Sequence, residues 1–256
     1  MGGQTRRVNR GRGHSYQLDG AKAPGVTTII GDGIPKPALV AWGPRMVAEF
    51  VADHLDELPG MLQSFGHDGF VRMLKDTPYN ERDKAARRGT EVHKLAEQII
   101  DGDEIDVPDE LTGHVDSYID FLNDWDVEPV LVEGVVVNRR HGYMGTLDLI
   151  ARLADGRVWL IDLKTTRSGI FGETAIQLAA YRWAEAYVDA DGEHPMLEVD
   201  EVAGLWVRAD GYDLHRVDAG PETFRKFLYA KQNAETMASL RDLVHAPVDP
   251  PKEAAA

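Results

Sequence analysis

The stretch from 143 to 163 constrains the fold more than any other part of the chain, because it predicts a β-hairpin of defined register. Residues 143–153 and 158–163 are apolar or alternate apolar with polar, and a short turn at 154–156 separates them. Gly156 suits the left-handed position that closes a three-residue hairpin loop. The sequence therefore predicts two neighbouring antiparallel strands.

This register brings charged side chains to one face of the sheet. With Asp155 at the centre of the loop, Asp148 faces Asp162 across the two strands. Lys164 shares that face, because side chains repeat every second residue along a strand. A two-residue turn at 155–156 would instead divide these side chains between the two faces. We favour the three-residue loop.

Two carboxylates that face each other across a strand pair repel and destabilise the sheet. A divalent cation removes that penalty, and hard oxygen ligands favour Mg²⁺ or Mn²⁺. The alternative is a solvated strand face on which Lys164 neutralises Asp162. The apolar run at 159–161 is typical of a buried strand, which favours the metal site.

The composition excludes several kinds of chemistry. The 256 residues include no cysteine, which excludes disulfides, a thiol nucleophile, cysteine zinc sites and an iron–sulfur cluster. No stretch is apolar for long enough to span a bilayer, and the first residues lack the apolar core of a signal peptide. We therefore expect a cytoplasmic protein.

The formal net charge of −15 is unusual for a protein that binds nucleic acid. Basic residues nevertheless cluster along the chain, and such clusters can line a phosphate track or form solvated faces. Four of them are candidates for DNA binding: Arg87, Arg88, Arg139 and Arg140.

The order of the expected elements predicts an α/β fold with a mixed central sheet flanked by helices and a helical N-terminal region. Residues 1–13 are expected to be a disordered basic arm, residues 14–246 a single domain, and residues 247–256 a disordered tail. Within the domain, 35–125 is the helical part and 88–245 the core that carries the site. Helices are expected at 38–54, in short pieces over 55–78, and at 80–100, 109–125, 172–188 and 221–243. Strands are expected in a hairpin around 16–20, and at 26–30, 129–138, 143–153, 157–163, 201–208 and 212–217.

Further candidate residues lie on the predicted helices. His93 borders an apolar stripe and could ligate a metal, or it could be a satisfied boundary histidine. Glu97, one turn later, is either a further ligand or a surface partner, and Glu133 on the strand before the hairpin is equally uncertain. Gln177 and Tyr181 share a helical face and could bind a phosphate oxygen or orient Lys164, although Tyr181 could also be a packing residue.

Taken together, these residues resemble the PD-(D/E)xK nuclease superfamily, and in particular its RecB-like branch, which includes CRISPR-associated and phage exonucleases. The resemblance covers residues 88–182 and depends on His93, Glu133, Gly145-x-x-Asp148, Asp162-x-Lys164 and Gln177-x-x-x-Tyr181. It implies a restriction-endonuclease-like sheet. Many relatives hold an iron–sulfur cluster through four cysteines, which this chain lacks.

The resemblance also implies roles for individual residues. Asp148, Asp162 and the Leu163 carbonyl would bind the catalytic metal, with His93 as a further ligand. Lys164 would orient or activate the attacking water. Gln177 and Tyr181 would position Lys164 and the DNA backbone.

On this basis we expect a metal-dependent DNA exonuclease in phage or prophage recombination or DNA processing, in the cytoplasm of a bacterial host. A single-strand annealing protein as partner and a homo-oligomer are family expectations. Two alternatives stay open: a structure-specific endonuclease on the same site, and an inactive module that binds nucleic acid.

Overall fold

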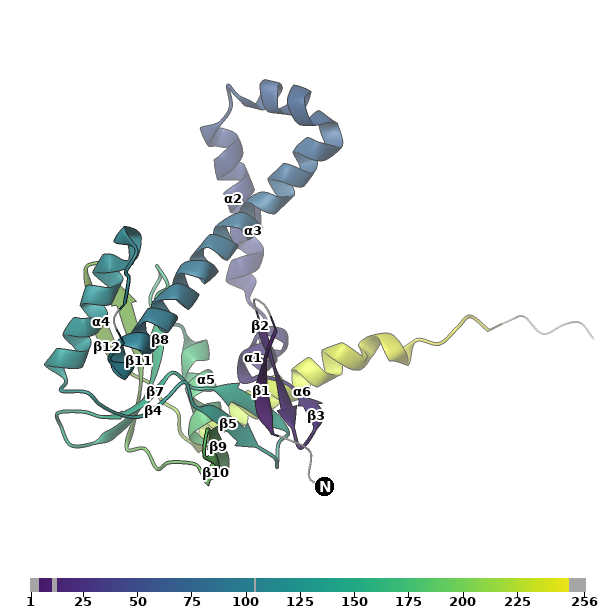
Figure 1. The fold of residues 1–256 in the computed structure, drawn as a ribbon. Helices are drawn as coiled ribbons and strands as arrows, with labels where there is room; N and C mark the ends of the chain where they lie inside the picture. Colours follow the sequence, from purple (N-terminus) through teal and green to yellow (C-terminus); the bar gives the residue numbers. More distant parts are fainter. Residues whose placement is uncertain (1–4, 11–12, 104, 249–256) are drawn as a thin grey trace, which may run out of the picture.

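A mixed five-stranded sheet lies at the centre of the fold, in a computed structural model that describes residues 5–10, 13–103 and 105–248 (Figure 1). Its strand order is β12-β11-β8-β7-β4, and within it β8 and β11 run parallel while the other neighbours are antiparallel. The strands are β4 (Glu128–Val132), β7 (Leu149–Arg152), β8 (Val158–Lys164), β11 (Glu201–Arg208) and β12 (Gly211–Arg216). This confirms the predicted α/β fold with a mixed sheet.

The predicted hairpin register is confirmed. Leu149 pairs with Ile161 and Ile150 with Leu160, which is the register of a loop centred on Asp155. Gly156 has a φ of 77°, so it occupies the left-handed position that the sequence predicted.

Two predicted strands, 129–138 and 143–153, are each divided between two sheets. β5 (Val135–Asn138) and β6 (Tyr143–Thr146) leave the central sheet and join a four-stranded sheet of order β10-β9-β5-β6. The chain turns this corner beside Glu133, whose φ of 48° lies outside the strand region. Apolar residues lie on both sides of Glu133 and Gly134, so the sequence predicted one continuous strand and did not reveal the corner.

The predicted helix at 172–188 is too long. Helix α5 covers Gly172–Arg182, and the chain then forms β9 (Ala186–Asp189) and β10 (Gly192–Pro195). The backbone N–H of Glu185 donates to the Val137 carbonyl at 2.8 Å. After α5 the main chain therefore forms its hydrogen bonds with the edge of β5 and does not continue the helix.

We expected residues 1–13 to be a disordered arm, but part of this segment forms a strand. Strand β1 (Arg6–Arg10) pairs with β2 (Gly13–Leu18), while residues 1–4 and 11–12 lie outside the described part. The predicted hairpin around 16–20 is confirmed, with β3 (Ala21–Ala23) as its second strand.

The predicted strand at 26–30 is wrong, because these residues begin helix α1 (Val26–Gly33). Its buried positions follow helical spacing: Val26, Ile29, Ile30 and Gly33. A Cβ on Gly33 would lie 2.0 Å from the Ala230 carbonyl oxygen, so α1 packs closely on α6 (Pro221–Ser239). Burial of this face outweighs the strand preference of β-branched residues.

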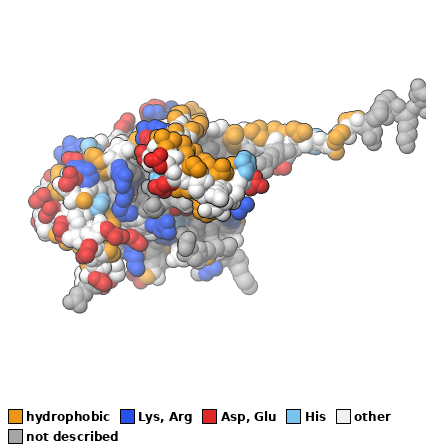
Figure 2. All heavy atoms as spheres, turned by 90° about the horizontal axis from the view of Figure 1, so that it is seen from above, with side chains coloured by type: hydrophobic (Ala, Val, Ile, Leu, Met, Phe, Trp, Pro, Cys, Tyr) orange, Lys and Arg blue, Asp and Glu red, His pale blue; other side chains and the backbone are white. Residues whose placement is uncertain are grey.

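Helices α2 (Pro37–Asp53) and α3 (Leu58–Asp101) form an arm that rises from the sheets (Figure 1). Gly66, with a φ of 66° and a ψ of 171°, is not helical and divides α3 into two helices. The break agrees with the short helices expected over 55–78, but the second helix passes through Pro78 and includes the helix expected at 80–100. α2 buries none of its side chains, and hydrophobic side chains gather over the arm when it is viewed from above (Figure 2).

The two faces of the central sheet are covered by different helices. On one face α1, α5 and α6 pack on residues such as Ile150 and Leu160. On the other face the last turns of α3 and helix α4 (Thr112–Asp124), which follows a 3₁₀ turn at Asp109–Leu111, pack on residues such as Leu149 and Ile161. The helix α4 and the strands β11 and β12 confirm the predictions for these segments.

A 3₁₀ turn, Leu240–Leu243, ends the predicted helix at 221–243. All but two residues of the tail expected at 247–256 lie outside the described part of the chain. Within the described residues, no helix combines the length and the apolar character needed to cross a membrane.

Candidate metal centre

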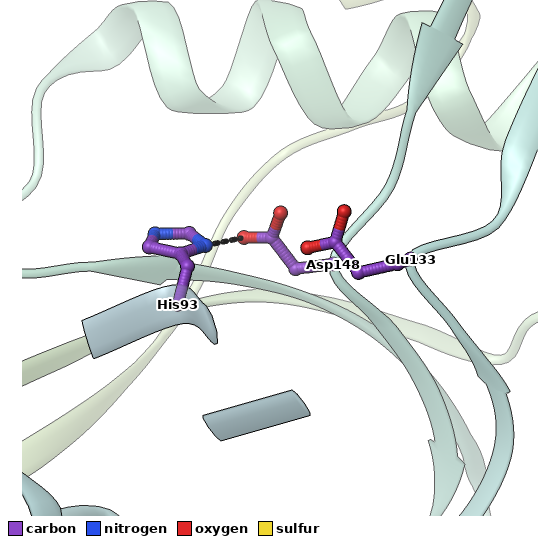
Figure 3. Close-up of side chains that lie close together, drawn as sticks. All are labelled: His93, Glu133 and Asp148. Atoms are coloured by element: carbon purple, nitrogen blue, oxygen red, sulfur yellow. Dashed lines mark ion pairs between the residues drawn. The ribbon is translucent and has the colours of Figure 1, made fainter. Parts of the chain in front are cut away.

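Three side chains converge where the strands pass from one sheet to the other (Figure 3). His93, Glu133 and Asp148 each offer one potential ligand atom, and these atoms lie within 4.8 Å of one another. His93 comes from α3, and its Nδ1 lies 3.6 Å from Asp148 Oδ2. One imidazole and two carboxylates make a donor set that could hold a divalent metal ion.

The backbone of the corner fixes the two carboxylates. The Glu133 N–H donates to the Asp148 carbonyl at 3.0 Å, and the Leu147 N–H donates to the Gly134 carbonyl at 2.9 Å. These two hydrogen bonds join the segment around Glu133 directly to the segment around Asp148. The left-handed conformation of Glu133 is uncommon for a residue with a side chain, and such strain is often found at functional sites.

The three side chains line a small cavity of about 20 Å³, together with Glu97. That volume is roughly enough for one water molecule or ion. Burial raises the pKa of Glu133 to about 7, with a further increase from the negative charge of Asp148. A cation in this cavity would relieve both effects, which is the physical argument that these residues fit a metal.

Asp162 and Lys164 are two residues apart on β8 and so share a face of that strand, but they form a set of contacts separate from the cluster. The Asp162 side chain is 1% exposed and forms an ion pair with Lys164, while Gln177 Nε2 donates to its Oδ1 at 2.8 Å. Gln177 Nε2 also lies 3.2 Å from the Tyr181 hydroxyl oxygen. These contacts bring together four of the predicted site residues: Asp162, Lys164, Gln177 and Tyr181.

Burial and charge act in opposite directions on the Asp162–Lys164 pair. Complete burial raises the pKa of Asp162, although Lys164 opposes the shift. Burial alone would lower the pKa of Lys164, but the charges of Asp162 and Asp148 outweigh it and the pKa is raised. Lys164 therefore stays protonated and compensates a buried carboxylate, so this strand face is not the solvated one of the alternative interpretation.

The main chain links the two sets of residues. The Leu163 N–H donates to Asp148 Oδ2 at 2.7 Å, which ties Asp148 to the strand that carries Asp162 and Lys164. The Leu163 carbonyl as a metal ligand, and Asp162 as another, stay predictions. In this conformation Asp162 contacts Lys164 and Gln177 and is not part of the three-residue cluster.

Close packing explains Gly145, the first residue of the Gly145-x-x-Asp148 motif, and Gly89, which lies four residues before His93 on α3. A Cβ on Gly145 would lie 2.6 Å from the Tyr181 ring and 3.1 Å from a Val26 methyl group. A Cβ on Gly89 would lie 3.3 Å from Thr165 Oγ1, just after Lys164. Gly145 therefore allows Tyr181 to pack against β6, and Gly89 allows α3 to approach the end of β8.

The basic candidates lie in different places. Arg87 is exposed on α3, and Arg88 on the same helix is half-buried. Arg139 forms ion pairs with Glu193 at 2.6 Å and Asp19 at 3.1 Å, so its charge is compensated within the fold. Arg139 and the exposed Arg140 follow β5, at the opposite end of that strand from Glu133.

Sequence reasoning missed the contribution of the N-terminal hairpin. Arg7 Nη1 lies 3.4 Å from Glu133 Oε2 and 3.5 Å from Thr146 Oγ1. The Tyr16 hydroxyl lies 2.9 Å from the same Thr146 oxygen. Arginines in a Gly- and Arg-rich terminus carry no periodic signal, so the sequence did not indicate that one of them reaches the site.

Comparison with known proteins does not assign a family. No protein-family model matches the chain, and no match is found among curated protein sequences. Similar solved structures include one described as "Crystal structure of SSO0001", with 13% identity and a TM-score of 0.30. That match covers 51% of this chain and 62% of the other, less than two thirds of its length, and at this TM-score it supports no conclusion about fold or function.

Proposed function

We propose that this protein is a metal-dependent deoxyribonuclease, and more specifically an exonuclease, that hydrolyses phosphodiester bonds. The observation that carries the proposal is the location of two sets of residues at one corner of the sheet. The cluster of His93, Glu133 and Asp148 lies beside the pair of Asp162 and Lys164, and the Leu163 N–H links the two.

The chemistry follows from these residues. His93, Glu133 and Asp148 would hold Mg²⁺ or Mn²⁺, which when bound polarises the phosphate and lowers the pKa of a bound water. The imidazole is a softer donor than a carboxylate, so we expect Mn²⁺ to bind more tightly than Mg²⁺. Lys164 holds a proton and a positive charge beside the cluster and would stabilise the charge that develops on phosphate oxygens.

Gln177 has a positioning role in this proposal. Its Oε1 lies 3.4 Å from Lys164 Nζ, and its Nε2 donates a hydrogen bond to Asp162 Oδ1. These contacts limit where the lysine can point. Burial raises the pKa of Tyr181, so its phenol stays neutral and can accept the hydrogen bond from Gln177.

The test is cleavage of end-labelled linear DNA, single- and double-stranded, with Mg²⁺, Mn²⁺ or EDTA. We expect metal-dependent shortening that Asp148→Asn and Lys164→Ala abolish. The matched control is Lys226→Ala, which changes an equal charge on α6. A closed circular substrate distinguishes the alternatives, because an exonuclease leaves it uncut. DNA binding without cleavage under any condition would contradict the proposal and favour a binding module.

A further inference from the structure

Lys164 and Gln177 also line a second, much larger pocket. Its volume is about 430 Å³, whereas the metal cluster lines the small cavity on the other side of the strand end. The remaining walls come from α1, from the segment 35–39 that leads into α2, from the loop 165–171 after β8, and from the first turn of α5. Pockets of about 300 to 1,000 Å³ are typical of small-molecule sites.

The walls of this pocket are largely apolar and open to solvent. Phe171 and Leu39 are each 54% exposed, and Pro35 and Pro37 are exposed beside them. The charged groups that line it are Lys36, Lys164 and Glu173, and of the two lysines Lys164 is already paired with the buried Asp162 while Lys36 is exposed. Exposed apolar side chains that border a charged site are typical of a ligand-binding surface.

The loop that carries Phe171 is held in place. The Trp206 indole N–H donates to the Thr166 carbonyl at 2.6 Å, and the Thr166 hydroxyl donates to the Gly169 carbonyl at 2.5 Å. The Thr174 N–H donates to the Phe171 carbonyl at 3.0 Å. The aromatic ring is therefore presented from an ordered loop, which lowers the entropic cost of binding a ligand against it.

We propose that this pocket binds a base of the DNA strand next to the phosphate that is cleaved, with Phe171 stacking on the base. The inference rests on the proposed function, because Lys164 would join the pocket to the metal centre. A base offers a flat apolar face, and its flanking phosphates are anionic. The pocket has an aromatic and proline wall for the flat face, and the exposed Lys36 offers a cation to a flanking phosphate.

The test measures binding without cleavage. Short end-labelled DNA strands, single and double, are titrated with the full chain in EDTA and in Ca²⁺, and binding is followed by fluorescence anisotropy. Stacking of a base on an aromatic ring contributes about 1–3 kcal/mol, so Phe171→Ala is expected to weaken binding by about 5- to 100-fold. Phe171→Tyr keeps a ring and is expected to restore binding.

Tyr229→Ala is the matched control, because Tyr229 is an exposed aromatic residue on α6 that does not line the pocket. Phe171 is half exposed, so its variants are expected to melt at the temperature of the unsubstituted protein, which a thermal scan checks.

The outcomes separate this inference from the proposed function. If Phe171→Ala binds DNA as tightly as the unsubstituted chain, or if the Tyr229 variant weakens binding equally, the pocket is not a base site, even when metal-dependent cleavage is observed. If the unsubstituted chain binds no DNA, the inference is overturned. If DNA binding depends on Phe171 but no metal supports cleavage, the result supports base binding in the pocket and contradicts the nuclease proposal.

Discussion

Replacing Glu133 by glutamine is expected to stabilise the protein at neutral and alkaline pH. Burial first, and then the charge of Asp148, raise the pKa of Glu133 from 4.5 to about 7. Each pKa unit corresponds to about 1.4 kcal/mol, so the ionised carboxylate costs about 3 kcal/mol of folding free energy. Glutamine keeps the shape of the side chain and removes the charge.

The sign of the pH dependence follows from the same shift. Because the pKa of Glu133 is higher in the folded than in the unfolded state, the folded protein binds the proton more tightly. The cost is absent below about pH 4.5, grows between pH 4.5 and about 7, and is fully present above that range. Glu133→Gln should therefore match the unsubstituted protein at acid pH and exceed it in stability at about pH 8 by up to about 3 kcal/mol.

The assay is thermal unfolding followed by circular dichroism, in EDTA, from acid to alkaline pH. For a chain of this length, about 3 kcal/mol corresponds to an increase of about 6 to 12 °C in the midpoint. Glu128→Gln is the matched control, because Glu128 is exposed at the start of β4, the strand that ends just before Glu133. This variant removes an equal charge, and its midpoint of thermal unfolding should change with pH as that of the unsubstituted protein does.

Addition of Mn²⁺ gives a second measurement. A cation that binds only the folded state stabilises it by mass action. The unsubstituted protein should gain more from Mn²⁺ than Glu133→Gln, because the variant has lost a charged ligand. The reasoning would be refuted by a variant that shows no gain in stability at about pH 8, or by an equal response of both proteins to Mn²⁺.

Three further substitutions test the packing around the site. Gly145→Ala should destabilise the fold by about 1–3 kcal/mol in urea denaturation, because its Cβ would lie 2.6 Å from the Tyr181 ring; an unchanged midpoint would mean that Tyr181 can move freely. Lys164→Met should cost about 3–5 kcal/mol at neutral pH in the same assay, because it leaves the buried Asp162 carboxylate without its partner, and the double variant with Asp162→Asn should recover most of that loss. Gln177→Leu should cost about 1–3 kcal/mol, since it removes a donor to the same carboxylate; Gln232→Leu on the exposed part of α6 is its control and should change stability little.

The sequence was most informative at the hairpin, where the turn residues and the strand pattern favour the same register. A glycine with positive φ closes the hairpin, and this single requirement set the register that places Asp162 and Lys164 on one face. Helical spacing likewise identified His93 at the edge of the buried stripe of α3. In these segments local chemistry and tertiary packing favour the same structure.

The sequence was less informative where tertiary contacts decide between two acceptable local structures. Residues 26–30 are β-branched, but they form a helix because α6 offers a surface that Gly33 can approach closely. Residues 129–138 are apolar apart from Glu133, Gly134 and Asn138, and this pattern did not identify Glu133 as the point where the strand changes sheet. For the same reason the role of Glu133 stayed uncertain until its neighbours were known.

The corner explains why the candidate metal centre lies where it does. Two strands leave the central sheet side by side, and each gives up its regular partners over the same one or two residues. Such a break costs backbone pairing and, at Glu133, an unfavourable φ, which together would destabilise a sheet built only for packing. The break also frees two neighbouring side chains, Glu133 and Asp148, to point at His93 while their main chains remain bonded to each other. The like charges there remain costly even with Arg7 at 3.4 Å from Glu133, because the pKa of Glu133 is still raised to about 7. A bound metal ion would offset both costs, so we expect removal of one carboxylate to relax the corner as well as to weaken metal binding.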